Sequence, residues 1–100
     1  MTYAVVYAET AVRDIEDLGD YLISERGEEF AKAYLGRLRI RIGTLQRNAH
    51  RFRERKELGP GCRALLVPPY LVFYRLAGTT VYVQRVLHGS RNITPESLGS

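Results

Sequence analysis

The chain has 100 residues, of which 45% are hydrophobic and 26% are charged. These proportions predict one globular domain over residues 1–100, and they exclude a disordered chain and a membrane protein. The longest apolar runs are far too short to span a membrane and no leader-like segment opens the chain, so a cytoplasmic protein is expected.

The net charge of +4 is unevenly distributed. Residues 1–30 contain eight acids and two arginines, whereas residues 31–100 contain three acids and thirteen bases, most of them arginines. Arginine presents a planar fork that suits phosphate and carboxylate oxygens, so the basic part of the chain favours oriented contacts with anions. A solvated surface explains any single arginine equally well.

The first elements predicted are a strand and an acidic helix. Tyr3–Ala8 is rich in β-branched and aromatic residues, which indicates a strand. Thr10 is a plausible N-cap for the helix that follows, and Gly27 is its predicted end. The helix carries apolar residues at helical spacing, with acids on its other side. The apolar residues are Ala11, Ile15, Leu18 and Leu22.

A second, basic helix and a long loop are predicted next. An apolar stripe runs from Ala31 to Leu45, and the bases between Lys32 and Arg47 form its outer face. The stretch Arg37–Ile42 alternates as a strand would, but the longer window fits the helical period better. Residues 48–60 are polar and charged and end in a Gly-Pro-Gly turn, which indicates a loop.

Three strands complete the predicted domain: Cys62–Val67, Tyr70–Leu76 and Thr80–Leu87. The short gaps between them predict an antiparallel meander, so the fold class is α+β with a two-helix hairpin packed on one face of the sheet. Alternation leaves apolar residues on both faces, with Val81 and Val83 on one side and Val86 on the other. The second face has no predicted cover, and a large open apolar surface usually marks a partner site.

Five segments in this order resemble the ParE branch of the ParE/RelE toxins. They are Tyr3–Tyr7, the acidic helix Ala11–Tyr21, Glu57–Arg63, Tyr70–Arg75 and the Arg-Val-Leu-His-Gly-Ser-Arg-Asn run of Arg85–Asn92. No single segment is specific, but the resemblance spans nearly the whole chain.

The resemblance implies the toxin of a bacterial type II toxin-antitoxin system. It implies a cognate ParD-like antitoxin in a hetero-oligomer, with an antitoxin tail that folds onto the toxin, and DNA gyrase as the target. It implies no cofactor and no catalytic chemistry, and the lone Cys62 offers no metal-ligand spacing. The candidate antitoxin- or target-binding residues are Arg63, Tyr70, Arg75, Arg85, His88 and Arg91.

The alternative is a ribosome-dependent messenger RNA endoribonuclease of the RelE branch. Metal-independent cleavage needs a base, an acid and cations for the phosphorane charge, and Glu57, Arg63, Arg85 and His88 are candidates. RelE-like nucleases typically carry further basic or tyrosine residues near the chain end, and residues 89–100 lack tyrosine, lysine and histidine. Strand alternation also points Arg85 and His88 to opposite faces.

Bland roles compete with these functional ones. His88 suits a histidine that hydrogen-bonds backbone where the last strand turns away, and His50 suits a surface loop. Arg63 and Arg75 can pair with Glu54 or Glu57 inside the monomer. A basic nucleic-acid-binding module is a third possibility, but the basic helix lacks a recognised DNA-reading motif, so direct nucleic-acid binding is not expected.

Overall fold

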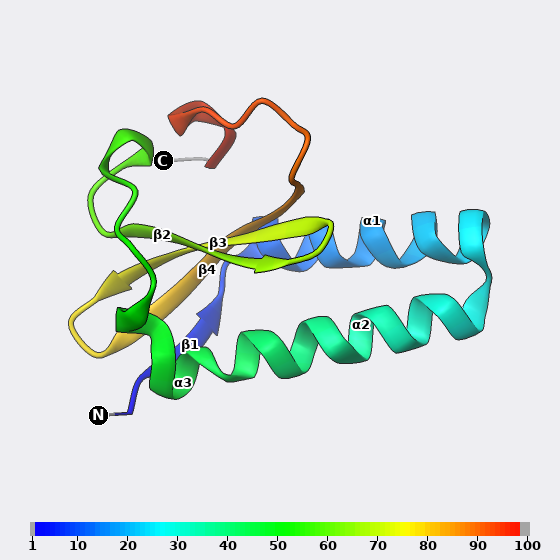
Figure 1. Cartoon of the computed structure of the whole chain (residues 1–100), viewed down its shortest axis with the longest axis horizontal. Helices are drawn as coiled ribbons and strands as arrows, with labels where there is room; N and C mark the ends of the chain where they lie inside the picture. Colours follow the sequence, from blue (N-terminus) through cyan, green and yellow to red (C-terminus); the bar gives the residue numbers. More distant parts are fainter. Residues whose placement is uncertain (1, 99–100) are drawn as a thin grey trace.

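A four-stranded sheet and a long helical hairpin make up the architecture in a computed structural model that describes residues 2–98 (Figure 1). The α+β class, the element order and the packing of the helices on one sheet face, all predicted from the sequence, are confirmed. The helices are α1 (Glu9–Arg26), α2 (Glu28–Gly43) and α3 (Leu45–Asn48), the strands are β1 (Ala4–Tyr7), β2 (Cys62–Val67), β3 (Tyr70–Ala77) and β4 (Thr80–His88), and the short 3-10 helices are η1 (Ala49–Arg51), η2 (Lys56–Leu58) and η3 (Pro95–Leu98).

The two long helices follow their apolar stripes, but both begin earlier than predicted. Helix α1 begins at Glu9, so Thr10 lies in its first turn and is not the N-cap. The Thr10 hydroxyl donates instead to the backbone oxygen of Gln84 at 2.8 Å, which ties the start of α1 to β4. Gly27, at φ +91°, separates α1 from α2, a left-handed conformation that glycine adopts without steric cost.

The sheet has the strand order β1-β4-β3-β2. Strands β2, β3 and β4 form the predicted antiparallel meander, and β1 lies parallel to β4, with Ala4 opposite Thr80 and Tyr7 opposite Val83. Because β1 pairs only with this first half of β4, the second half of β4 has a strand neighbour on one side only. None of the helices in residues 2–98 is long and apolar enough to cross a membrane.

A β-bulge in β4 corrects the predicted alternation. Phe73 pairs with Arg85, whereas the next residue, Tyr74, pairs with Val83, so Gln84 is an extra residue in β4. One inserted residue reverses the side-chain alternation beyond it. Val86 therefore joins Val81 and Val83 in the core beneath the helices, whereas strict alternation had placed it on the other face.

The second face of the sheet is partly covered by the chain itself, so the prediction of an open face is wrong for that part. Leu58 of η2 and Leu98 of η3 pack with Cys62, Phe73 and Leu87 in a second apolar cluster. Isolated apolar residues in irregular segments carry no periodic signal, so this cover escaped the sequence analysis. The part that stays open exposes Val6, Leu66 and Tyr82.

Candidate functional site

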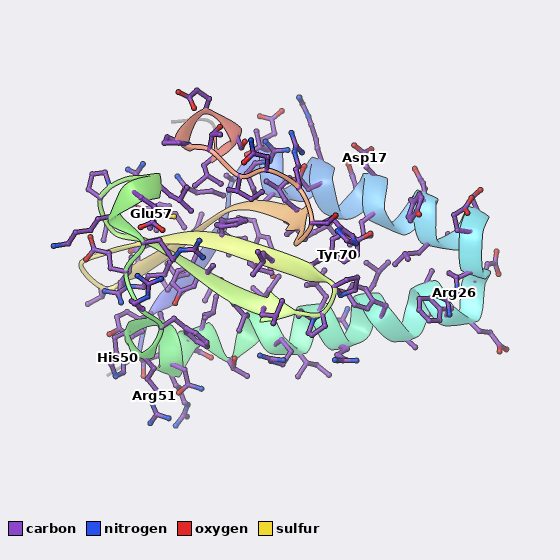
Figure 2. All side chains as sticks on the ribbon, turned by 45° about the horizontal axis from the view of Figure 1, so that its top comes forward. Asp17, Arg26, His50, Arg51, Glu57 and Tyr70 are labelled. Carbon is purple, nitrogen blue, oxygen red and sulfur yellow. The ribbon has the colours of Figure 1, made fainter. Side chains whose placement is uncertain are left out.

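Tyr70 and His88 meet at the end of the sheet nearest the helical hairpin. The two residues are paired across β3 and β4, and their rings lie edge to face with centroids 5.2 Å apart. They line a cleft of about 380 Å³ between the hairpin and the β2–β3 turn, and Arg91 lies beside them in an adjoining hollow. Figure 2 shows Tyr70 at this junction of sheet and hairpin, with Arg26 farther out along the hairpin. Among the predicted site residues, these three are brought together.

This cleft, the aromatic cleft, combines rings with cations. Tyr34 and Tyr70 form one wall, with ring centroids 5.7 Å apart, and Arg26 stacks over the Phe30 ring at 4.0 Å on the other side. The Tyr34 hydroxyl donates to the backbone oxygen of Val67 at 2.6 Å. Burial raises the pKa of Tyr34 to about 12, so its hydroxyl stays neutral. The charged residues of the lining are Arg26, Arg37 and Glu25, so with its rings and a surplus of cations the cleft suits an apolar or acidic group of a partner.

His88 is held by the turn that follows β4. Its Nδ1 accepts the backbone N–H of Ser90 at 3.0 Å and lies 2.7 Å from the Ser90 hydroxyl oxygen. With Nδ1 as the acceptor, the neutral ring carries its proton on Nε2. The geometry therefore matches the structural role considered for His88, a histidine that secures the backbone at the strand end.

Arg85 is engaged inside the molecule. Its guanidinium donates to both carboxylate oxygens of Asp14, at 2.7 and 3.0 Å, and to the backbone oxygen of Ser97 at 2.6 Å. The hydrogen bond that Arg85 donates to Asp14 raises the pKa of Arg85. Asp14 also accepts the backbone N–H of Val86 at 2.9 Å, on the half of β4 that lacks β1. Arg85 thus joins α1, β4 and η3, and it is not free to hold a partner.

The other predicted residues lie apart from this end of the sheet. Arg63 donates to the backbone oxygen of Phe52, and its Nε is buried without a hydrogen-bond partner. Glu57 is exposed and pairs with Arg55 at 3.0 Å. The pKa of Glu57 is lowered, chiefly by the hydrogen bond that its carboxylate accepts from its own backbone N–H and next by the one that it accepts from Arg55. Arg75 is exposed and makes no salt bridge within residues 2–98.

The four residues proposed for RNA cleavage do not converge. Arg63 follows the side of β2 that faces the helices, as His88 does on β4, whereas Arg85 points to the opposite face with Phe73. Glu57 lies well away from Tyr70, the cross-strand partner of His88, along the long axis of the molecule (Figure 2). No group of three or more metal-ligating side chains occurs within the described part of the chain.

A groove that the sequence analysis missed lies between α1, α2 and β1. It has a volume of about 420 Å³, and it is mostly apolar, with Glu16 and Arg39 as its charged members. Its apolar residues are Tyr7, Val12, Ile15, Leu35, Leu38 and Ile42. We call it the hairpin groove. One feature of the sequence indicates this groove: Val12 is apolar but lies outside the apolar stripe of α1. In the structure Val12 is 42% exposed.

Gly19 shapes this hairpin by allowing the two helices to approach. A Cβ atom on Gly19 would lie 3.3 Å from Cδ1 of Leu35, tighter than ordinary van der Waals contact. Gly19 thus leaves room for Leu35, which lines the groove.

Comparisons with known proteins agree on one family. A family model described as the ParE toxin of the type II toxin-antitoxin system parDE matches residues 5–93. Toxin ParE3 from Caulobacter vibrioides is 30% identical over 83 residues, which is 83% of this chain and 83% of the relative.

Solved structures of toxin-antitoxin systems share the fold. A chain of the chromosomal ParDE system from P. aeruginosa matches with a TM-score of 0.76 at 21% identity, covering 87% of this chain and 96% of that one. A chain of the toxin-antitoxin complex RelBE2 from Mycobacterium tuberculosis matches with a TM-score of 0.57 at 29% identity, covering 88% and 99%.

Proposed function

The chain belongs to the ParE toxin family of type II toxin-antitoxin systems, and we propose that a ParD-like antitoxin neutralises it by occupying the hairpin groove. The observation that carries this proposal is the groove itself, which is largely apolar and which residues 2–98 leave open. An exposed channel between two helices is suited to an apolar face of a partner segment that folds as it binds. The structural relatives come from ParDE and RelBE2 toxin-antitoxin systems, which supports a partner of this kind.

The charges at the groove specify the partner further. Glu16 on α1 and Arg39 on α2 line the same channel. An antitoxin segment with an apolar stripe, a base near Glu16 and an acid near Arg39 matches both charges. The aromatic cleft, with Tyr70, His88 and neighbouring Arg91, is a second anchor in this proposal, for an acidic or aromatic part of the same tail.

Substitution in the groove tests the antitoxin proposal. The full chain is co-expressed with the product of the adjacent reading frame, and the affinity of the purified pair is measured. Val12→Glu places a charge in the groove and is expected to weaken binding at least tenfold, about 1.4 kcal/mol. Ile40→Glu is the control, because Ile40 is 68% exposed on α2 and does not line the groove. Equal affinities of the two variants would refute the groove as the antitoxin site.

We propose DNA gyrase as the target, reached by protein contact without catalysis. The resemblance to the ParE branch supports this target. So does the engagement of Arg85 with Asp14 and Ser97, and of Arg63 with Phe52, which leaves neither guanidinium available to a phosphate.

The ribonuclease remains the second candidate because of the 29% identity to a chain of the RelBE2 complex. Two assays on the purified full chain separate the candidates. Inhibition of gyrase supercoiling, or trapped cleaved DNA, with intact ribosome-bound message supports the gyrase proposal. Cuts in ribosome-bound message with unimpaired gyrase would overturn it.

A further inference from the structure

Four exposed cations cluster on the segment that links α2 to β2. They are Arg47, Arg51, Arg53 and Lys56, which we call the basic platform. Figure 2 shows Arg51, with His50, projecting from the end of the molecule opposite to the hairpin tip near Arg26. Within residues 2–98, none of the four forms a salt bridge.

The acids of the same segment are directed elsewhere. Glu54 accepts the backbone N–H of Gly61 at 3.1 Å, and Glu57 pairs with Arg55 at 3.0 Å. Both carboxylates thus have hydrogen-bond partners outside the basic platform. The four cations of the basic platform therefore have no carboxylate within salt-bridge distance in the part of the chain that the structure describes.

The segment that carries the platform is fixed to the core at several points. Leu45 and Ala49 are fully buried, and the backbone oxygen of Ala49 accepts the Tyr74 hydroxyl at 2.6 Å. The Phe52 ring packs edge to face on Tyr74, with centroids 6.5 Å apart.

Backbone hydrogen bonds add to these anchors. The N–H of Tyr3 donates to the oxygen of Gln46 at 2.7 Å, and the N–H of Arg55 donates to the oxygen of Cys62 at 2.6 Å. The anchored residues alternate with the exposed cations, so the cations are presented on a fixed scaffold. A preorganised array loses less entropy when it binds a rigid partner.

We propose that the basic platform contacts the phosphate backbone of duplex DNA, without reading its sequence. Three of its four members are arginines, whose forks match phosphate oxygens. Of the rings in the segment, Phe52 packs onto Tyr74, and the exposed His50 lies beside Tyr3 with ring centroids 6.0 Å apart, so a single imidazole is the one ring available for stacking on single-stranded bases. The choice of DNA over RNA rests on the proposed gyrase target, an enzyme that holds duplex DNA.

Salt dependence of binding tests the platform. Fluorescence anisotropy measures the purified full chain on a labelled 20-base-pair DNA duplex across a salt series. Four phosphate contacts predict a log–log salt slope of about −3 to −4. The triple variant Arg47→Gln, Arg51→Gln, Arg53→Gln is expected to lose about 3 from the magnitude of that slope.

A matched variant controls for net charge. Arg13→Gln, Lys32→Gln, Arg41→Gln removes the same charge from the α1–α2 hairpin, at residues outside both proposed antitoxin sites, and is expected to retain most of the slope. Equal losses in both variants, or no loss in the first, would overturn the proposal. Tighter binding of an RNA duplex would overturn the DNA proposal in favour of RNA. Displacement of DNA by polyglutamate at equal charge would overturn it in favour of an acidic protein.

This assay contains no gyrase, so it separates the two proposals. If the platform variant loses DNA binding and the wild-type chain does not inhibit gyrase, only the proposed target is refuted. Gyrase inhibition without measurable binding of the wild-type chain to DNA refutes only the platform.

Discussion

Asp14 is the residue on which the junction of α1, β4 and η3 depends. Its carboxylate accepts two hydrogen bonds from Arg85 and one from the backbone N–H of Val86. The Val86 amide lies on the half of β4 without β1, where an unpaired donor would be costly. The side chains of Arg85 and Asp14 are only 21% and 14% exposed, so salt screens the attraction between them weakly.

Asp14→Asn is expected to lower the free energy of unfolding by about 2–3 kcal/mol, because it removes the charge that faces Arg85. Chemical denaturation at neutral pH measures the change. The control is Asp17→Asn, the same substitution at an exposed aspartate of the same helix. It is expected to change the free energy of unfolding by no more than about 0.5 kcal/mol. A similar stability for Asp14→Asn and wild type would show that the pair contributes nothing net.

At the scale of elements, η2 and η3 convert the second face of the sheet into a second core. Leu58 and Leu98 cover Phe73 and Leu87, and the Arg85–Ser97 hydrogen bond fastens η3 to the sheet. The open part of this face is thereby limited to its margin, where Val6, Leu66 and Tyr82 are exposed.

Leu98→Ala is expected to destabilise the fold by about 2–4 kcal/mol, because it removes a buried side chain from a small cluster. Thermal or urea unfolding gives the measurement. Leu66→Ala serves as the control, since Leu66 is 52% exposed on the same face and its truncation is expected to cost much less. If both leucines proved equally dispensable, η3 would not cover the sheet in solution.

Periodic elements were predictable from the sequence, and long-range or irregular ones were not. The stripes of α1 and α2 and the short gaps between β2, β3 and β4 are local signals. The parallel pairing of β1 with β4, the extra residue Gln84 and the cover by Leu98 depend on tertiary contacts that no local pattern encodes.

The candidate site was predictable only in part, for a related reason. Tyr70, His88 and Arg91 gather because strand pairing and the turn after β4 bring them together. In the sequence, Arg63 and Arg85 look equally available to a partner. In the structure, Arg63 donates to the backbone oxygen of Phe52, in an irregular loop, and Arg85 donates to Asp14, which is far away along the chain. The hairpin groove could not be predicted, because it forms where two helices pack together and the apolar stripe of one helix does not define that packing.

For the whole molecule, two buried tyrosine hydroxyls connect the helical layer and the sheet. Tyr34 of α2 donates to Val67 of β2, and Tyr74 of β3 donates to Ala49 of η1. Burial raises the pKa of both, that of Tyr34 to about 12 and that of Tyr74 higher still.

The fold is therefore expected to weaken in alkaline solution. Because folding raises both pKa values above the 10.0 of a free tyrosine, the folded chain keeps protons that the unfolded chain releases. Stability is complete below pH 10 and falls as pH rises toward the folded pKa values, by about 1.4 kcal/mol per pH unit for each tyrosine. Denaturant unfolding from pH 8 to 11.5 measures this slope.

Tyr34→Phe separates the two tyrosines. It removes one hydrogen bond, which costs about 1 kcal/mol at neutral pH, and it is expected to reduce the slope between pH 10 and 11.5 by about 1.4 kcal/mol per pH unit, the contribution of one tyrosine. An unchanged slope in this variant would assign the alkaline weakening to other groups.

The parallel pairing of β1 with β4 also has a consequence for how the chain is made. A ribosome delivers Ala4–Tyr7 long before their hydrogen-bonding neighbours, Thr80–Val83, emerge. The hairpin of α1 and α2 can form early from local contacts, whereas the sheet beneath it waits until β4 has been synthesised. Tyr7, which lines the hairpin groove, pairs with Val83 of that strand, so a nascent chain that has not yet reached β4 lacks the finished groove.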